Sequence, residues 1–290
     1  MKILVTGGNG QLGTELRNLA GLYPELEFIF TDIQELDITN QDQVEPYLKD
    51  IKPNWILNCA AYTAVDKAEL ERAIAMKVNC DAPTLLATLG RELGIGMMHV
   101  STDYVFDGTN HLPYKEFDQV NPQSAYGESK LKGEVEVLRN RGIVIRTSWL
   151  YSAYGNNFVK TMLRLGKEKE SIGVIFDQIG TPTWAHDLAK AMISMVIKIG
   201  IKTDSYSGIY HFSNEGVCSW YDFSRKIMQL SGSPCQVNPI ETADYPLPAP
   251  RPAYSVLNKK KIKETFKIEI PHWEQSLIKC LNLLLKDKKI

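Results

Sequence analysis

The fold of this chain is decided near its start by residues 3–13, Ile3-Leu4-Val5-Thr6-Gly7-Gly8-Asn9-Gly10-Gln11-Leu12-Gly13. The first residues form a short apolar run, as in a buried strand, and leucines then recur at helical spacing at positions 12, 16 and 19. Between them, Gly7, Gly10 and Gly13 stand three residues apart. Strand, glycine turn and helix in this order are typical of dinucleotide binding, in which the backbone approaches a pyrophosphate at the helix N-terminus.

The same alternation continues through the first half of the chain. Apolar runs predict strands at residues 28–30, 55–57, 97–100 and 143–146. Helical patterns fall at 41–49, in a polar stretch that ends at residue 79, at 83–93 and at 125–138. Alternating strands and helices predict an α/β fold, here a Rossmann-type doubly wound parallel sheet with helices on both faces. We expect residues 1–150 to form this dinucleotide-binding domain, with later segments returning to it.

Beyond residue 150 the alternation loosens. The pattern there predicts a smaller C-terminal lobe, mainly residues 151–290, which we expect to bind substrate. Residues 245–252 read YPLPAPRP, which predicts an extended, rigid segment at the surface. Apolar positions between 277 and 284 predict a final amphipathic helix that packs on the core.

Composition excludes several classes of function. The 33 Lys and Arg residues nearly balance the 34 Asp and Glu residues, so the chain lacks the basic surplus that nucleic acids or anionic membranes attract. No run of about 18 apolar residues is present, and the N-terminal apolar run is too short for a signal peptide. The five scattered cysteines suit neither a disulfide framework nor a zinc site. We therefore expect a cytoplasmic protein without a metal, membrane or nucleic-acid partner.

Asp32 follows the second predicted strand, about 20 residues after the glycines, a spacing typical of the acid that binds the adenosine ribose. A carboxylate there accepts a hydrogen bond from the ribose 2′-hydroxyl and repels a 2′-phosphate, which favours NADH. No basic residue adjoins Asp32, although one remote in sequence is able to bind that phosphate. The alternative role for Asp32 is to cap a turn.

Tyr126 and Lys130 stand four residues apart on a predicted helix, so both side chains leave the same face. A neighbouring ammonium lowers the pKa of a phenol, which is about 10 in water, and fits it for proton transfer to a carbonyl oxygen. Thr102 ends the strand before this helix, at the edge of the sheet where ligands bind, and offers a hydroxyl to the same oxygen. Ser101 is the competing choice.

Five ordered motifs resemble a known family: TGGNGQLG at 6–13, NCAAYTAVD at 58–66, STDYVFDG at 101–108, YGESK at 126–130 and RTSWLY at 146–151. Together they resemble the dTDP-4-dehydrorhamnose reductases, which are extended short-chain dehydrogenases/reductases. The likeness extends into the C-terminal half, for example at RPAYS, residues 251–255. It implies reduction by NADPH or NADH of the 4-keto group of dTDP-4-dehydro-β-L-rhamnose to dTDP-β-L-rhamnose, in surface polysaccharide biosynthesis.

The resemblance also implies a set of site residues. The catalytic residues are expected to be Thr102, Tyr126 and Lys130, of which Tyr126 and Lys130 also contact the cofactor. The other cofactor-binding residues are expected to be Gly7, Gly10, Gln11, Leu12, Gly13, Asp32, Asp37, Ile38, Ala60, Ala61, Tyr62 and Thr63. The residues around the dTDP-linked ketosugar, apart from Thr102, are expected to be Val65, Asp103, Tyr104 and Trp149. For Trp149, packing in the core is the alternative.

One departure bears on assembly. Family members that dimerise through magnesium bind it with glutamates, of which Glu15 is in place here while His186 occupies a later ligand position. The expectation is therefore a monomer or homodimer without a metal site. Three other functions stay open: a reductase of another nucleotide-linked ketosugar, a redox sensor, and a non-catalytic dinucleotide-binding subunit similar to the β-subunit of methionine adenosyltransferase. The intact catalytic residues argue against the last two.

Overall fold

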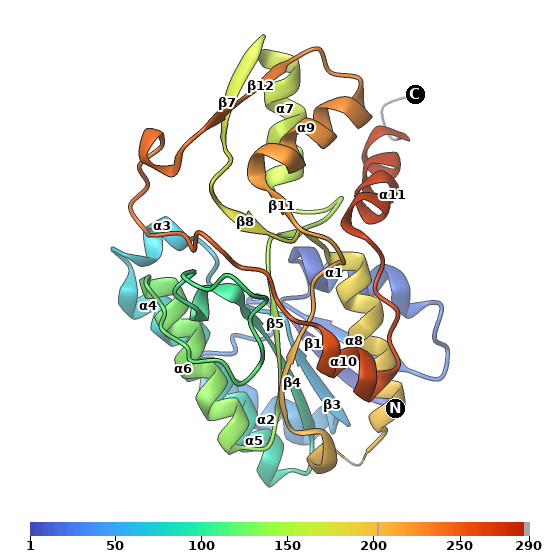
Figure 1. The fold of residues 1–290 in the computed structure, drawn as a ribbon. Helices are drawn as coiled ribbons and strands as arrows, with labels where there is room; N and C mark the ends of the chain where they lie inside the picture. Colours follow the sequence, from blue (N-terminus) through green and yellow to red (C-terminus); the bar gives the residue numbers. More distant parts are fainter. Residues whose placement is uncertain (202, 287–290) are drawn as a thin grey trace.

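The structure, a computed structural model, describes residues 1–201 and 203–286 and is built around one parallel sheet (Figure 1). Six strands form this sheet in the order β2-β1-β3-β4-β5-β10, and all the neighbouring strands in it run parallel. The strands are β1 (Lys2–Thr6), β2 (Glu27–Thr31), β3 (Trp55–Asn58), β4 (Gly96–Thr102), β5 (Ile143–Thr147) and β10 (Gly208–His211). The predicted α/β fold is confirmed.

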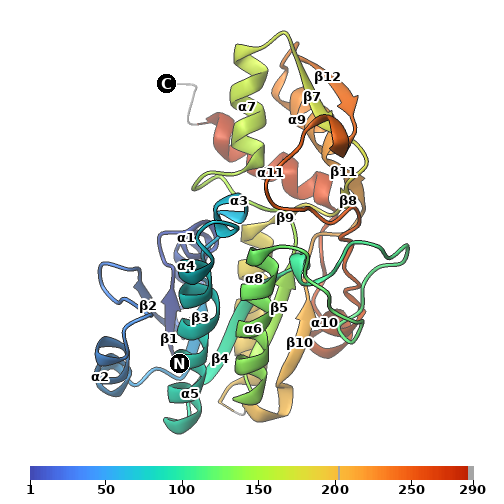
Figure 2. The same ribbon diagram turned by 90° about the vertical axis from the view of Figure 1, so that its left-hand side faces the viewer.

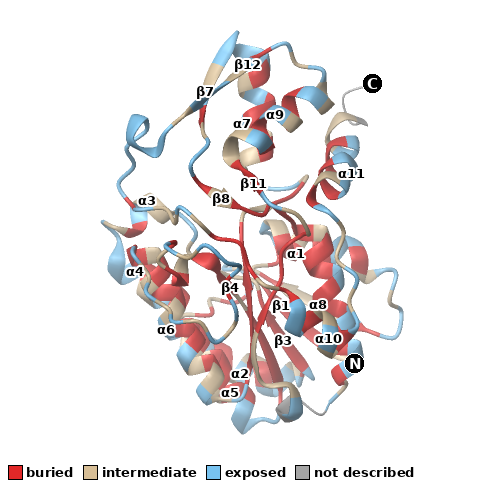
Figure 3. Ribbon diagram, in the orientation of Figure 1, coloured by how far each residue is buried: buried red, intermediate tan, exposed pale blue. Residues whose placement is uncertain are grey.

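Helices cover both faces of the sheet, because successive strand residues point to opposite sides (Figures 1 and 2). Ile3 and Val5 pack with the helices on one face, whereas Leu4 packs with those on the other. The first face holds α1 (Gln11–Ala20), α8 (Ala185–Ile199) and α10 (Lys260–Phe266). The second holds α2 (Gln41–Ile51), α5 (Ala82–Glu92) and α6 (Ala125–Arg139). Figure 3 shows the strands buried between these two layers.

The segment between β3 and α5 is helical but broken. It contains α3 (Val65–Ala68), α4 (Arg72–Met76) and the π-helical turn η1 (Lys77–Asp81) in place of the single polar helical stretch expected there. The 3₁₀ turn η2 (Asp103–Val105) directly follows β4. Both η1 and η2 lie against α6.

A second, smaller core lies beyond the carboxyl ends of the sheet strands (Figure 1). It is built by α7 (Phe158–Glu168), α9 (Trp220–Ser231) and α11 (Trp273–Lys286), with the strand pairs β7 (Ser171–Ile175) with β12 (Gln236–Ile240), β8 (Ile179–Gly180) with β11 (Cys218–Ser219), and β6 (Leu150–Tyr151) with β9 (Thr183–Trp184). Two 3₁₀ turns, η3 (Thr203–Tyr206) and η4 (Thr242–Asp244), complete the elements. The chain leaves the sheet after β5, builds part of this lobe, returns as α8 and β10, and leaves again.

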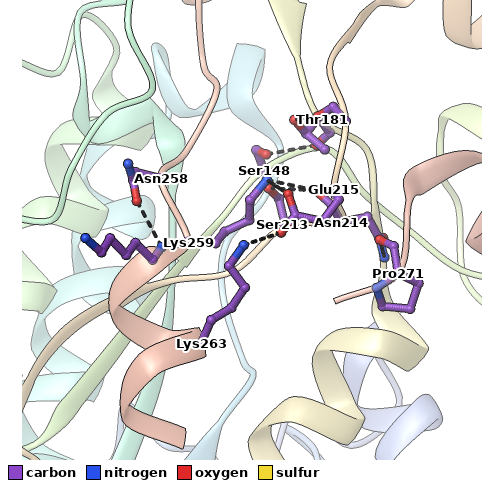
Figure 4. Close-up of polar contacts among 11 residues, drawn as sticks. Ser148, Thr181, Ser213, Asn214, Glu215, Asn258, Lys259, Lys263 and Pro271 are labelled. Carbon is purple, nitrogen blue, oxygen red and sulfur yellow. Dashed lines mark hydrogen bonds and ion pairs between the residues drawn. The ribbon is translucent and has the colours of Figure 1, made fainter. Parts of the chain in front are cut away.

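Buried polar groups join the two parts where the chain crosses between them (Figure 4). The Asn214 side chain is fully buried, accepts a hydrogen bond from the Trp184 backbone N–H at 2.8 Å and donates one to Asp187 at 2.8 Å. Lys259 donates to the Asn214 carbonyl at 3.0 Å and lies 3.4 Å from the Glu215 carboxylate. The junction between the sheet and the lobe is therefore held by directional contacts, which specify one arrangement of the two parts more strictly than apolar contacts alone.

Helix α6 lies so close to the backbone of η1 and η2 that two of its positions have no room for a side chain. A Cβ atom at Gly127 would lie 2.3 Å from the Tyr104 carbonyl oxygen, and one at Gly133 would lie 2.1 Å from the Asn79 carbonyl oxygen. On the same helix, Glu134 accepts two hydrogen bonds from the Arg146 Nε at 3.0 and 3.2 Å and one from its Nη2 at 2.7 Å. This ion pair ties α6 to β5.

Breaking this pair should destabilise the fold severely. Glu134 and Arg146 have exposed fractions of 0% and 2%, so Glu134→Ala leaves an unpaired buried guanidinium and should lower the free energy of unfolding by about 3–5 kcal/mol. Glu168→Ala is the control, because Glu168 pairs with Arg164 at the surface and such pairs contribute about 0–1 kcal/mol. Urea denaturation measures both variants, and equal losses would contradict the role of the buried pair.

Candidate active site

The glycine loop after β1 forms a backbone cradle. The Gly10 N–H donates to the Gly7 carbonyl at 3.1 Å, and Gly7 has a φ of 67°, a region that favours glycine. A Cβ at Gly7 would lie 2.7 Å from the Cα of Ala60, and one at Gly13 would lie 2.3 Å from the Gly7 carbonyl oxygen. Helix α1 begins directly after this loop, at Gln11. A glycine-rich loop at a helix N-terminus fits the pyrophosphate of a dinucleotide.

This cradle lies where the sheet topology favours ligand binding. Strand β1 lies between β2 and β3: the chain passes from β1 outward to β2 and then back across β1 to β3, so the direction in which strands are added reverses at β1. Ligands of open α/β sheets bind outside the carboxyl ends of the strands at such a point. Gly7 follows β1 and Ala60 follows β3, and their backbones meet there.

Asp32 and Asp37 are the two carboxylates predicted to contact the adenosine half of the cofactor, and both stabilise turns of the chain. Asp32 accepts the Asn9 backbone N–H at 2.9 Å through Oδ2 and the Ile33 N–H at 2.9 Å through Oδ1. Asp37 accepts two hydrogen bonds from Thr39, which lower the pKa of its carboxyl. Ile38 is 7% exposed and its side chain belongs to the core, so its backbone is what remains for a ligand. Asp32 thus orients the glycine loop and retains acceptor capacity for a ribose.

The segment after β3 is fixed by one buried amide. Asn79 in η1 accepts the Tyr62 backbone N–H at 2.8 Å and donates to the Tyr62 carbonyl at 3.0 Å. The Tyr62 hydroxyl donates a short hydrogen bond to Glu71, which raises the pKa of that phenol to about 12. Ala61 and Thr63 flank this anchored residue. The expected cofactor wall is therefore a rigid backbone segment beside the glycine loop.

Thr102, Asp103 and Tyr126 meet at the end of β4. Tyr126 and Thr102 are hydrogen-bonded through their hydroxyl groups, and Thr102 donates to Asp103 Oδ1 at 3.1 Å. Because Asp103 is 3% exposed, burial raises the pKa of its carboxyl to about 7, against the opposing hydrogen bond from Thr102. The Ser255 side chain also interacts with this carboxyl and opposes the rise in its pKa. A hydroxyl pair and a carboxyl group are thereby presented together at the carboxyl end of the sheet.

Lys130 is buried beneath this group, with an exposed fraction of 1%. Its Nζ donates to the Val100 carbonyl at 2.7 Å and lies 3.2 Å from His99 Nε2. Burial lowers the pKa of Lys130 to about 8, partly offset by the nearby Glu134. The expectation that Tyr126 and Lys130 leave the same face of one helix is met, since both lie on α6.

The pKa of Tyr126 differs from the sequence-based expectation. Burial raises the pKa of this phenol to about 12, and the interaction with the Thr102 side chain opposes that rise. The predicted lowering by Lys130 is absent because the ammonium is bound to Val100 and His99, on the strand side of the helix. With its pKa raised in this way, Tyr126 is a protonated hydroxyl at neutral pH, which is the form that a proton donor needs.

The residues expected around the substrate lie at the same edge of the molecule. The rings of Tyr104 and Tyr126 meet edge to face, 5.5 Å between centroids, and Val65 begins α3. Trp149 has a φ of 49° and stacks on Trp220, 3.5 Å between centroids. This stack packs Trp149 against the C-terminal lobe, so the packing role considered for it is realised, while a positive φ in a large side chain is typical of strained functional positions.

Four residues near this edge were not singled out from the sequence. Arg251, in the proline-rich segment, forms a bidentate ion pair with Asp66 at 2.5 and 2.6 Å and contacts Tyr104. The others, His99, Ser255 and Trp220, approach Lys130, Asp103 and Trp149 respectively. His99 and Trp220 belong to no sequence motif that would indicate a functional role. The RPAYS motif was the one available pointer, to Arg251 and Ser255.

Glu15 and His186 do meet in the structure. The Glu15 carboxylate accepts the Ser152 hydroxyl at 2.6 Å and lies 3.2 Å from His186 Nδ1. Within residues 1–201 and 203–286, no three His, Cys, Asp or Glu side chains form a group that could hold a metal ion. No helix in the same ranges is long and apolar enough to cross a membrane.

Comparisons with known proteins agree over nearly the whole chain. The family model described as the RmlD substrate binding domain matches residues 1–286. The dTDP-4-dehydrorhamnose reductase of Aggregatibacter actinomycetemcomitans is 44% identical, and the alignment covers 95% of this chain and 97% of that protein. Among solved structures, a dTDP-4-dehydrorhamnose reductase from Clostridium acetobutylicum is 45% identical with a TM-score of 0.91, covering 98% and 99% of the two chains.

A second solved relative carries a cofactor. The dTDP-4-dehydrorhamnose reductase of Bacillus anthracis, crystallised in complex with NADP, is 41% identical with a TM-score of 0.89 and covers 97% of this chain and 98% of its own. The family model and these relatives each match nearly the whole length of the chain. The chain belongs to the RmlD substrate binding domain family.

Proposed function

We propose that this protein is a dTDP-4-dehydrorhamnose reductase, which reduces the 4-keto group of dTDP-4-dehydro-β-L-rhamnose to dTDP-β-L-rhamnose with NADPH or NADH. The observation that carries the proposal is the hydroxyl pair of Tyr126 and Thr102 at the end of β4, with Lys130 buried below. A relative that is 44% identical, with 97% of its own length covered, bears this name. The reaction belongs to dTDP-rhamnose and surface polysaccharide biosynthesis.

The residues present fit a bound nicotinamide dinucleotide. Gly7, Gly10 and Gly13 provide the cradle for its pyrophosphate, since a Cβ at Gly7 or Gly13 would collide with backbone. Gln11 and Leu12 begin the helix behind that cradle, and residues 60–63 form the neighbouring wall. When bound, the reduced nicotinamide supplies the hydride.

The protein's own residues then complete the reduction. The Thr102 hydroxyl hydrogen-bonds the ketone oxygen and orients it toward Tyr126. As the carbonyl carbon gains its hydride, the oxygen gains negative charge, and Tyr126 donates its proton to that oxygen, so the product is an alcohol. The Lys130 ammonium, buried on the same helix as Tyr126, offsets the negative charge of the phenolate left behind. Asp103, Tyr104, Val65 and Trp149 are the proposed sugar contacts.

The rival functions lack a comparable observation. A regulatory subunit or redox sensor needs a dinucleotide site but no proton donor, whereas Tyr126 is held in its protonated form beside a second hydroxyl. A reductase of another nucleotide-linked ketosugar would use the same hydroxyl pair and differ in the lobe. We propose that residues 1–150, with the returning segments α8, β10 and α10, bind the cofactor, and that the lobe formed mainly by 151–290 binds the dTDP-sugar.

The proposal extends to the setting of the reaction. All five cysteines are free thiols, which fits a reducing cytoplasm. The near-neutral charge gives no reason for a nucleic-acid partner. We propose a cytoplasmic monomer or homodimer that needs no metal ion to assemble.

Tyr126→Phe tests the reaction and its acid together. Loss of the phenol proton should lower kcat by about 10²-fold or more while the variant still binds NADPH, because only proton donation is removed. The measurement is the loss of reduced-nicotinamide absorbance after addition of dTDP-4-dehydro-β-L-rhamnose. Tyr47→Phe, on α2, is the matched control and should turn over like wild type. A wild-type protein that binds cofactor yet leaves this sugar unreduced would sink the proposal.

The pKa of Lys130 predicts a specific pH dependence of stability. The pKa lies at about 8 in the folded protein and at 10.5 in the unfolded chain, so between these values the unfolded state binds more protons. Stability should therefore rise with pH across this window. Relative to Lys130→Met, the wild-type free energy of unfolding should gain about 3 kcal/mol between pH 7.5 and 10.5.

Chemical denaturation at several pH values measures this difference. Lys132→Met is the control on the same helix, because the Lys132 side chain is 53% exposed and pairs with Glu128 at the surface. Its stability should follow the wild-type pH dependence up to pH 10. If the Lys130→Met curve also ran parallel to wild type, Lys130 would not titrate in this range.

A further inference from the structure

The outer face of α1 carries an arginine that points back to the glycine loop. Arg17 Nη2 lies 3.4 Å from the Gly8 carbonyl oxygen and 3.5 Å from Asn9 Oδ1. Its guanidinium carbon lies 4.4 Å from the centroid of the Phe30 ring. Phe30 is on β2, two residues before Asp32. The contacts of Arg17 therefore come from the loop and from the end of β2.

We propose that Arg17 recognises the 2′-phosphate of NADPH and sets the preference of this protein for NADPH over NADH. The proposal rests on the proposed function, since both cofactors bind at the glycine loop. The adenosine ribose of a dinucleotide lies at the carboxyl end of the second strand in this fold, and an arginine nearby accommodates the extra phosphate. No basic residue adjoins Asp32 in sequence, so a charge from α1 fills that need.

Arg17 has donors to spare for a phosphate. A guanidinium carries five N–H donors, and the two contacts that Nη2 makes lie at the long limit for hydrogen bonds. The contact with the Phe30 ring helps to position the guanidinium, whose planar array of donors suits bidentate binding of phosphate oxygens. The side chain is also exposed, so a ligand reaches it without displacing the core.

Asn9 contacts both of the opposing charges. Its backbone N–H donates to Asp32 at 2.9 Å, while its side-chain oxygen lies 3.5 Å from Arg17. Glu35 adds a second carboxylate, which accepts the Asp32 backbone N–H at 2.9 Å. Carboxylates accept a ribose hydroxyl and repel a phosphate, whereas the guanidinium attracts the phosphate. With Arg17 neutralised, the carboxylates would leave a site suited to NADH.

Binding titrations without sugar substrate test the proposal independently of turnover. Purified wild type, Arg17→Gln and Arg17→Lys are titrated with NADPH, NADH, 2′,5′-ADP and 5′-ADP by calorimetry. Arg17→Gln should weaken NADPH and 2′,5′-ADP about tenfold or more, the scale of a charge-assisted hydrogen bond, while NADH and 5′-ADP change less than about twofold. Arg17→Lys keeps the charge and should lie between wild type and Arg17→Gln.

Arg164→Gln is the matched control, because Arg164 lies on α7 and pairs with Glu168 at the surface of the lobe. It should bind all four ligands like wild type. Equal losses of NADPH and NADH in Arg17→Gln, or no loss of either, would overturn the role of Arg17 and leave the reductase proposal standing. A wild-type protein that bound neither cofactor would overturn both.

Discussion

The close approach of α6 to the backbone of η1 and η2 is the constraint on which the site depends. Gly127 and Gly133 have no room for a Cβ atom, so the helix lies against these carbonyl groups at a fixed distance and rotation. The Glu134–Arg146 ion pair holds the helix from the side of β5. With its position fixed in this way, α6 presents Tyr126 to Thr102 and inserts Lys130 beneath the strand end. The catalytic geometry is thus a property of helix packing.

Burial sets the protonation of the whole group in one direction. The low-dielectric surroundings disfavour charge on each member, so the pKa of Asp103 and Tyr126 rises while that of Lys130 falls. The site therefore approaches a neutral state, in which the hydroxyl groups keep their protons. A buried polar cluster of this kind costs stability.

The sequence predicted the sheet, the glycine loop and the meeting of Thr102 with Tyr126, because all three depend on short-range patterns. Strand periodicity located the sheet strands of the first half, and a four-residue spacing put Tyr126 and Lys130 on one helix face. The sequence did not predict the contacts that depend on tertiary packing. Nothing local shows that Lys130 bonds to Val100 instead of lowering the pKa of Tyr126, or that Trp149 stacks on Trp220. Arg17 and Arg251 likewise acquire their meaning only from residues distant in the chain.

The path of the chain through the sheet has a consequence for folding. The edge strand β10 and helix α8 come after the first part of the lobe, so residues 150–184 are synthesised before the sheet is complete. Until then, β5 is an open edge and the apolar side of α1 lacks the helix that covers it. Contacts between residues so far apart in the sequence form slowly. Until they form, the incomplete sheet exposes an unpaired edge and apolar surface, which favour aggregation during and after synthesis. The sheet part and the lobe are therefore interleaved along the chain, and neither is one continuous segment that could be synthesised and completed before the other begins.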